Sequence, residues 1–312
     1  MMLKTFGLKN GKLVRETDKT KTKPRWIHID NATTEDFKKI SEFGISRNDF
    51  KQAIDKGQRS RIATREGYSM VLMNIPDNKS DEILTIGLFM KGKTLITVHE
   101  KTCKMVTNIV NSSDSLHNSE HTIFIRLLEE LNEVFYRRAE DIEDEIDKIE
   151  ERIHQNSSKD LIKDFFKVRK KLIYLNKALT GNREVISHMA MHPEAFNFNK
   201  IEKFEITEIH TDLIQVSDSI KIYREIISNA IEIYNSKVSN QINHIMKRLT
   251  LVGSFILLPT LIASIYGMNF KIDSGPWNMP ELYWEYGYLF SLGLMAGSIF
   301  LTFLYFKRKK WL

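Results

Sequence analysis

The sequence predicts an α+β cytosolic domain followed by long helices and a two-helix transmembrane hairpin. Runs rich in β-branched and aromatic residues are confined to about the first 120 residues, and charged segments with helical spacing dominate from residue 121. Two uncharged runs, 249–266 and 286–306, lie near the end of the chain. Helices of that length approach the thickness of a bilayer core, whereas core helices of a soluble protein rarely stay apolar on all faces.

Residues 1–120 are expected to form the cytosolic α/β domain. Short runs with β propensity are separated by turn signals such as Pro76-Asp77-Asn78 and Lys91-Gly92-Lys93. His99 ends the last of these runs, and we interpret it as a structural residue rather than a ligand. The predicted strands are 26–29, 68–75, 83–90 and 94–99, and the predicted helices are 33–43 and 47–56.

Residues 121–192 are expected to form a pair of long charged cytosolic helices, because their apolar residues recur with a spacing near 3.5. The first helix carries the acidic run 140–151, which we interpret as a solvated face with internal salt bridges. His188 and His192 stand four residues apart, but Pro193 follows and no third ligand is evident. We therefore predict no metal site at these two histidines.

Residues 193–269 are expected to form a stalk helix that continues into the first transmembrane helix, about 249–268. After Pro193 no proline occurs until Pro259, and no glycine occurs until Gly253. A continuous helix of this length extends on the order of 100 Å. Neighbouring helices allow Pro259 inside a membrane helix, where it introduces at most a slight bend.

One narrow stripe of this helix carries small and hydroxyl residues together with a few larger ones. In a membrane helix such residues either allow close helix packing or line a path for water and ions. Spacing alone favours packing. The stripe consists of Asn243, Met246, Leu249, Gly253, Leu257, Thr260 and Ser264.

Charge predicts the orientation of the hairpin. Basic residues precede the first apolar run (Lys247, Arg248) and form the tail 307–312 after the second, transmembrane helix 286–306. The connection 270–285 carries a net charge of −2 and many aromatic residues. The positive-inside tendency therefore places both termini in the cytoplasm and 270–285 in an extracellular loop, with tryptophans and tyrosines at the outer interface.

Composition excludes several functional classes. The formal charge is +6 and the isoelectric point about 9.1, but the clearest basic cluster follows a membrane helix, so anchoring at the inner leaflet explains it better than nucleic acid does. No phosphate-binding glycine loop, zinc-type Cys/His array or nucleophile elbow appears, so we predict no enzymatic activity and no cofactor. Cys103 is the single cysteine, and 1–25 lack an apolar segment, so we expect no intrachain disulfide and no cleaved signal peptide.

Two short motifs flank the outer end of the first transmembrane helix. Tyr266-Gly267-Met268-Asn269 stands where this helix should leave the membrane, and Met279-Pro280-Glu281-Leu282 lies in the connection. Together with two C-terminal membrane helices behind a mixed domain and long charged helices, these motifs make the chain resemble the CorA family of magnesium and divalent-cation transporters. The resemblance covers most of the chain.

This resemblance implies a homopentameric, funnel-like channel in a bacterial-type plasma membrane, surrounded by lipid. It would carry Mg²⁺ inward, with Co²⁺ or Ni²⁺ as further candidates. Asn269, supported by Gly267 and Met268, would form the selectivity site, and Met246, Leu249 and Leu257 match the apolar gate of the family. A Zn²⁺-transporting relative and a non-conducting, membrane-tethered coiled-coil scaffold are the alternatives.

The resemblance is weakest at the regulatory interface. Family members are thought to close when cytosolic Mg²⁺ binds carboxylates between neighbouring cytosolic domains, but here Lys51 and Gln52 replace those acids. The opposing position on the stalk corresponds to Glu208, and Glu232 lies further along the stripe. Glu208 and Glu232 are therefore candidate regulatory residues for Mg²⁺, and we hypothesise that a salt bridge of Glu208 with Lys51 weakens or replaces closure by Mg²⁺.

Overall fold

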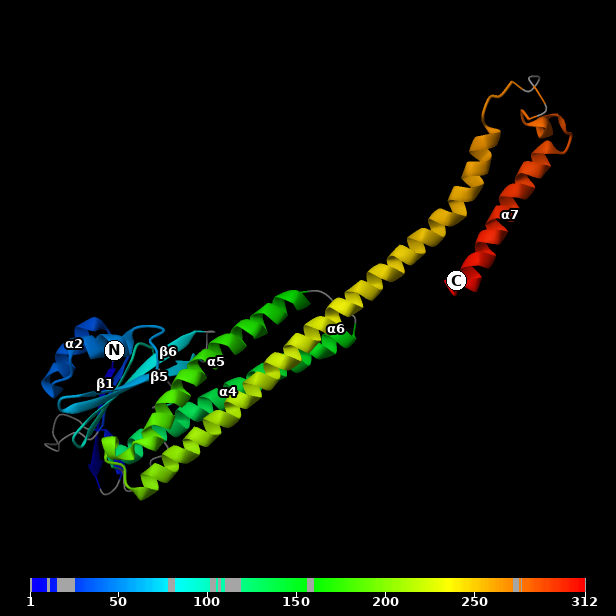
Figure 1. Cartoon of the computed structure of the whole chain (residues 1–312). Helices are drawn as coiled ribbons and strands as arrows, with labels where there is room; N and C mark the ends of the chain where they lie inside the picture. The colour runs from blue at the N-terminus through cyan, green and yellow to red at the C-terminus, as the bar shows by residue number, and fades with distance from the viewer. Residues whose placement is uncertain are drawn as a thin grey trace. The chain divides into compact units, whose positions relative to one another are not determined.

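The computed structural model describes residues 2–9, 12–15, 26–77, 82–101, 105, 108–109, 119–155, 160–271, 275 and 277–311. Contacts divide the chain into two compact units, Met1–Ile231 and Glu232–Leu312. The first unit contains the sheet and the long charged helices, and the second contains the two apolar helical segments (Figure 1).

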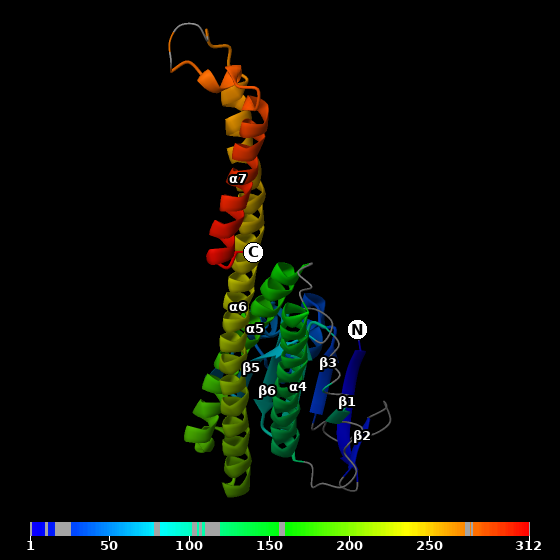
Figure 2. The same ribbon diagram turned by 90° about the vertical axis from the view of Figure 1, so that its right-hand side faces the viewer.

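The first unit is built on a seven-stranded sheet with the order β2-β1-β3-β7-β6-β5-β4. Neighbouring strands are antiparallel except for β3 and β7, which are parallel. In Figure 2 several of its strands are seen beside α4. The strands are β1 (Met2–Lys9), β2 (Lys12–Arg15), β3 (Trp26–Asp30), β4 (Arg61–Arg65), β5 (Tyr68–Pro76), β6 (Ile83–Lys91) and β7 (Thr94–His99).

The structure confirms the four predicted strands, β3, β5, β6 and β7, to within a residue or two at each end. The sequence did not indicate β1, β2 and β4. Strand β4 reads Arg-Ile-Ala-Thr-Arg, and it is the last strand at its end of the sheet. An edge strand that is short and charged resists further pairing, but it also lacks the apolar run that makes a strand recognisable.

The predicted helix 33–43 is wrong as a single helix. It is divided into η1 (Thr34–Asp36), α1 (Phe37–Ile40) and η2 (Ser41–Phe43), and Gly44 ends it in the left-handed conformation at φ 67°. Helix α2 (Arg47–Ile54) is confirmed and begins at Ser46, whose hydroxyl accepts a hydrogen bond from the Asp49 N–H at 3.1 Å.

The two faces of the sheet are covered by different helices. Helix α2 packs on β6 and β7, where Phe50 and Ala53 join Ile27, Phe89 and Val98 in one buried cluster. Helices α4 (Glu120–His154) and α5 (Leu161–Met191) contact β5, and α5 also contacts β4. Both long helices were predicted from their apolar spacing, and each buries one regular row of aliphatic and aromatic side chains.

Helix α6 (Lys200–Tyr266) is a single helix of 67 residues that joins the stalk to the first apolar segment, as predicted. It is shorter than the predicted 193–269, because 193–196 form the separate turn η3 (Pro193–Phe196) and the helix ends at Tyr266. Its start is capped by Asn199, whose side-chain oxygen accepts hydrogen bonds from the N–H groups of Ile201 at 2.8 Å and Glu202 at 3.0 Å. In the first unit it buries Ile206, Ile209, Leu213 and Ile220.

The second unit pairs the end of α6 with α7 (Gly287–Arg308), and η5 (Pro280–Tyr283) precedes α7. At one end of this hairpin the rings of Phe255 and Phe306 lie 6.2 Å apart, and the ammonium of Lys247 lies 5.7 Å from the ring centre of Trp311. At the other end the hydroxyl of Tyr266 donates to Glu281 Oε1 at 3.2 Å. Contacts at both ends therefore hold the two helices as a hairpin.

Candidate functional site

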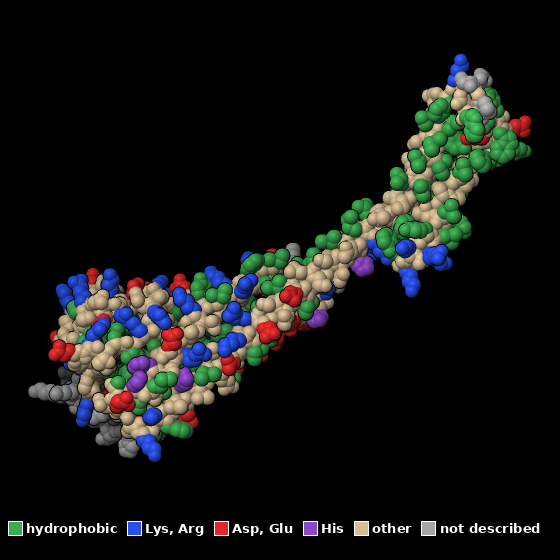
Figure 3. Space-filling model, viewed as in Figure 1, with side chains coloured by type: hydrophobic (Ala, Val, Ile, Leu, Met, Phe, Trp, Pro, Cys, Tyr) green, Lys and Arg blue, Asp and Glu red, His purple; other side chains and the backbone are tan. Residues whose placement is uncertain are grey.

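Two helices are long and apolar enough to cross a membrane by length and composition. Each contains an 18-residue window of mean hydropathy 1.9, one in the last part of α6 and one in α7. None of the α6 window is buried within the chain, and many hydrophobic side chains lie on the visible surface of this region (Figure 3). A helix that exposes apolar side chains all round needs lipid or other protein to cover them.

The candidate outer mouth begins where α6 ends. The N–H of Gly267 still donates to Ala263 O at 2.9 Å, and the N–H of Met268 donates to Ile265 O at 3.2 Å. Asn269 follows this last turn, and its side chain is exposed. Among the residues that the structure describes, none is hydrogen-bonded to its carboxamide.

The two motifs recognised in the sequence contact each other. Tyr266 of the first motif donates its hydroxyl to Glu281 of the second, and Asn278 Nδ2 donates to Lys271 O at 2.9 Å, which closes part of the connection. Gly287 starts α7 directly against Glu281 O, and a Cβ at this position would collide with that oxygen. Sequence reasoning did not identify the role of Tyr266 and Glu281 in holding the connection to the helix end.

The predicted stripe lies on the exposed side of α6. All seven of its residues, Asn243, Met246, Leu249, Gly253, Leu257, Thr260 and Ser264, are exposed within the chain. The half-buried residues of the same segment are Lys247, Leu251, Ser254, Phe255, Pro259, Ile262 and Tyr266. At about 100° per residue, the middle of the stripe lies roughly 150° around the helix from the half-buried face, which contacts α7.

The hydroxyl of Thr260, on this stripe, presents hydrogen-bond acceptors to its surroundings. Thr260 Oγ1 donates to Ile256 O at 2.7 Å, so its proton is used within the helix and its lone pairs face outward. A Cβ built on Gly253 would meet nothing within 4 Å, so in a single chain no neighbour requires a glycine there. Both features suit a face that meets hydrated ions or another copy of the helix.

The candidate regulatory residues do not form the expected pair within one chain. Lys51 and Glu208 are both exposed, and the described residues show no ion pair between them. Gln52 accepts a hydrogen bond from Arg61 Nη2 through its Oε1. Glu232 is exposed at the start of the second unit. The predicted pair of Lys51 with Glu208 remains a prediction about contacts between copies.

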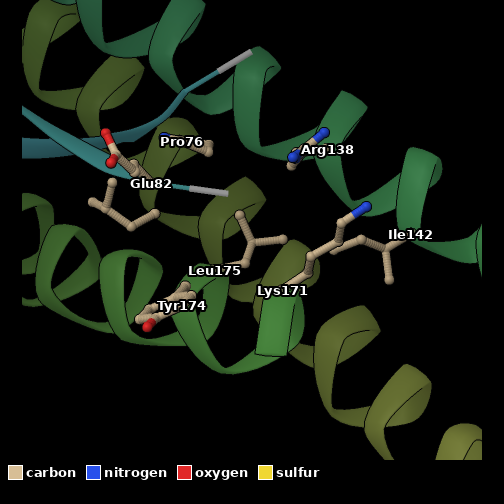
Figure 4. A pocket seen from close by; sticks show the side chains of 8 residues that line it. Pro76, Glu82, Arg138, Ile142, Lys171, Tyr174 and Leu175 are labelled. Carbon is tan, nitrogen blue, oxygen red and sulfur yellow. The ribbon is translucent and has the colours of Figure 1, made fainter. Parts of the chain in front are cut away.

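Glu208 instead lines an acidic groove between α4 and α6, with a volume of about 710 Å³. Partial burial, followed by the carboxylates of Glu202 and Glu208, raises the pKa of Glu205 in this groove. A second space, of only about 10 Å³ and partly open to solvent, lies beside Lys171, Leu175 and Arg138 (Figure 4). It has room for about one water molecule and is too small for a larger ligand.

The fold and these segments define a class of protein: a membrane protein with a large α+β domain and a C-terminal two-helix hairpin. The family described as CorA-like Mg2+ transporter protein matches residues 21–308, and the chain belongs to this family.

Three comparisons illustrate the match. The cobalt/magnesium transport protein CorA of Thermotoga maritima is 26% identical over 304 residues, which span 93% of this chain and 84% of that protein. The protein of the same name from Methanocaldococcus jannaschii is 25% identical, over 92% of this chain and 91% of its own. The complete structure of the CorA magnesium transporter from M. jannaschii superimposes with a TM-score of 0.86 at 22% identity, over 99% of this chain and 98% of that chain.

Proposed function

We propose that the chain forms a channel-like transporter that brings divalent cations, Mg²⁺ first and Co²⁺ or Ni²⁺ as further candidates, into the cytosol. The observation that carries this proposal is the position of Asn269. Its exposed carboxamide follows the last turn of an apolar helix whose exposed stripe faces away from α7. Several copies arranged around an axis along that stripe, five by resemblance, would bring their Asn269 side chains into one ring.

A ring of carboxamides suits a hydrated magnesium ion. Mg²⁺ binds six oxygens in near-ideal octahedral geometry and loses its waters reluctantly. Neutral amide oxygens accept hydrogen bonds from those waters without stripping them. A ring of carboxylates would hold the ion more strongly, and conduction requires binding that is weak enough for release. Gly267 and Met268 support this site by ending α6 just before Asn269.

Below the mouth, the stripe changes from polar to apolar. Ser264 and Thr260 carry hydroxyl groups nearest the mouth. Leu257, Leu249 and Met246 follow and are bulky and apolar, with Gly253 between the two leucines. An apolar constriction blocks ions by excluding water. We assign these three residues to a gate and Asn243 to the cytosolic end of the path.

The membrane potential supplies the driving force in this proposal. The free energy of a divalent ion falls by about 4.6 kcal/mol per 100 mV of membrane potential when it moves inward. No nucleotide hydrolysis and no other enzymatic activity is therefore needed. The basic residues Lys247, Arg248 and Lys307–Lys310 support cytoplasmic termini in a plasma membrane. Lipid covers the exposed apolar surface of α7, and further copies of the chain cover the stripe of α6.

Uptake into liposomes tests the proposal. Protein is reconstituted with an internal Mg²⁺ indicator, and a K⁺ diffusion potential drives entry. We expect wild type to conduct and Asn269→Ala to lose at least tenfold in Mg²⁺ flux. Asn269→Asp has the same shape with a charge, and we expect it to bind Mg²⁺ more tightly but conduct more slowly.

Asn240→Ala is the matched control, because Asn240 is also exposed on α6 but lies outside both the stripe and the apolar window. It should leave flux unchanged. Full Mg²⁺ flux in Asn269→Ala would show that the mouth lies elsewhere. No flux in wild type, with the protein correctly inserted, would favour the scaffold alternative, and a purely monomeric state in lipid would exclude a shared pore.

A Zn²⁺-transporting relative is the alternative within the same family. The proposed amide ring binds hydrated ions through their waters. It offers no imidazole or thiolate, the ligands that favour Zn²⁺. Competition in the same liposomes separates the two: excess Mg²⁺ should suppress Zn²⁺ entry if Mg²⁺ is preferred.

A further inference from the structure

Three buried side chains of the kind that bind metals gather in the sheet of the first unit. His28 and Asp30 belong to β3, and His99 belongs to β7, the parallel neighbour of β3. His28 stands opposite Thr97, so 28, 30, 97 and 99 share one face of the sheet. Asp30 and His99 are the last residues of their strands, so both lie at the carboxyl edge of this parallel pair.

The three side chains are close together and almost fully buried. His28 is 1% exposed, Asp30 6% and His99 2%. Each offers a ligand atom within 4.8 Å of the ligand atoms of the other two. His99 Nδ1 lies 3.7 Å from Asp30 Oδ1, and the ring centres of His28 and His99 are 4.8 Å apart.

Two acceptors in this group are left without donors. His99 Nδ1 is hydrogen-bonded to Lys101 O, and because a carbonyl oxygen only accepts, Nδ1 carries the proton. The lone pair of the neutral ring is then on Nε2. This atom and Asp30 Oδ1 are buried and have no hydrogen-bond partner in the part of the chain that the structure describes. Buried acceptors are normally paired with a donor, a water or an ion.

His28 is oriented in a similar way. Its Nδ1 lies 2.8 Å from Thr97 Oγ1, which also accepts from Trp26 Nε1 at 3.2 Å. Binding a metal through Nε2 requires the tautomer in which His28 Nδ1 donates its proton to this hydroxyl. Metal-binding imidazoles are commonly oriented by such a bond from the other ring nitrogen.

We propose that His28, Asp30 and His99 form a buried site for a transition-metal ion such as Zn²⁺ or Co²⁺, separate from the ion pathway. Two imidazoles and a carboxylate suit these ions, whereas Mg²⁺ prefers oxygen ligands and keeps its waters. Ligand atoms around a tetrahedral Zn²⁺ stand roughly 3.4 Å apart. The ligand atoms here lie up to 4.8 Å apart, so in this proposal the side chains rotate to that spacing when the ion binds, and a water completes the coordination.

One nearby charge opposes a cation. Lys4 of β1 pairs with His28 across the sheet, and its charge contributes to the lowered pKa of both histidines. The single carboxylate of Asp30 offsets this charge. We therefore expect a site that binds reversibly and responds to the metal content of the cytosol.

Metal binding to the full chain tests this site. Tag-free protein in detergent, with Cys103→Ser to remove the single thiol, is stripped with a chelator and dialysed against Zn²⁺ or Co²⁺ in excess Mg²⁺. We expect one Zn²⁺ per chain, and Co²⁺ absorption bands typical of imidazole coordination. Asp30→Asn and His99→Gln should each weaken binding at least tenfold, whereas Asn269→Ala should leave it unchanged.

His192→Gln is the matched control, because the exposed His188 and His192 also lie close, with ring centres 4.7 Å apart. Zn²⁺ should raise the melting temperature of wild type and His192→Gln but not of Asp30→Asn. If a variant does not fold, the Co²⁺ spectrum of wild type still decides. Binding lost only in His192→Gln, unchanged affinity in Asp30→Asn, or no bound ion in wild type would overturn the proposal, the last outcome indicating a buried water instead.

Discussion

At the scale of single residues, Asn182 of α5 takes the place of a missing strand partner. Strand β4 pairs with β5 only as far as Leu72, which leaves Asn74 of β5 without a backbone neighbour on that side. The carboxamide of Asn182 fills this gap: its Oδ1 accepts from Asn74 N at 2.9 Å and its Nδ2 donates to Asn74 O at 2.7 Å. Ser60 Oγ also donates to Oδ1 at 2.7 Å.

Replacing Asn182 with leucine keeps the size of this fully buried side chain and removes all three hydrogen bonds. The N–H and C=O of Asn74 then stay buried without partners, so we expect a loss of about 2–4 kcal/mol. Thermal melting of the full chain in detergent should show a lower melting temperature. Asn240→Leu, at an exposed position, is the control, and an equal shift in both variants would contradict the assignment.

Asp49, a buried residue of α2, organises a second polar cluster. Arg65 binds its carboxylate through two nitrogens, at 2.9 and 3.1 Å, and the hydroxyl of Tyr68 donates to it at 2.6 Å. Asp49 is 1% exposed. The hydrogen bonds from Arg65, then from Tyr68, hold the pKa of this carboxyl below its usual range despite its burial.

This lowered pKa predicts a dependence of stability on pH. A carboxyl group that titrates lower in the folded chain stabilises it above about pH 4, the unfolded pKa, and that contribution is lost as pH falls through the folded pKa. Asp49→Asn should melt well below wild type at pH 7, and the gap should narrow below about pH 4. Melting curves from pH 7 to 3 measure this, and a gap that does not change with pH would contradict it.

At the scale of elements, the contact between α2 and the sheet depends on a glycine. Gly87 of β6 lies directly under Ala53 of α2, and a Cβ on Gly87 would collide with the Cβ of Ala53. The absence of a side chain lets the helix approach the strand closely, so Phe50 and Phe89 can share one core.

Gly87→Ala should therefore destabilise the first unit by about 1–3 kcal/mol, because the helix must move or the core must deform. Adding Ala53→Gly removes the colliding methyl group and should recover part of this loss. Amide hydrogen exchange of β6 and α2 in the full chain would report both effects. Slower exchange in Gly87→Ala than in wild type would show that the contact is not tight.

At the scale of the whole molecule, we hypothesise that any control by cytosolic Mg²⁺ acts through contacts between copies of the chain. The acids of the family are replaced here by an exposed cation, Lys51, and by Gln52, which is held by Arg61. This surface offers no carboxylate for Mg²⁺ at these two positions. A bound ion would therefore neutralise little negative charge between copies.

We therefore expect millimolar cytosolic Mg²⁺ to reduce the current of this transporter less than twofold. Lys51→Glu combined with Gln52→Asp should introduce several-fold closure, because two carboxylates then need a counterion. Patch-clamp recordings with Mg²⁺ on the cytosolic side measure both. Strong closure of wild type that disappears in Lys51→Ala would contradict the hypothesis.

Elements with long, regular patterns could be predicted from the sequence. Helices α4 to α7 and strands β3, β5, β6 and β7 were predicted because apolar periodicity over many residues depends only on the local chain. The Gly-Met-Asn motif likewise identified Asn269 as the candidate mouth without coordinates.

Features that depend on residues far apart in the chain could be seen only in the folded molecule. Strands β1, β2 and β4 were missed because partners in the sheet, rather than their own composition, make them strands. Asn182 meets Asn74 across 108 positions, and His28 meets His99 although the sequence marked His99 only as structural. Burial and pairing between distant segments arise only when the sheet and helices pack together, and no local pattern encodes them.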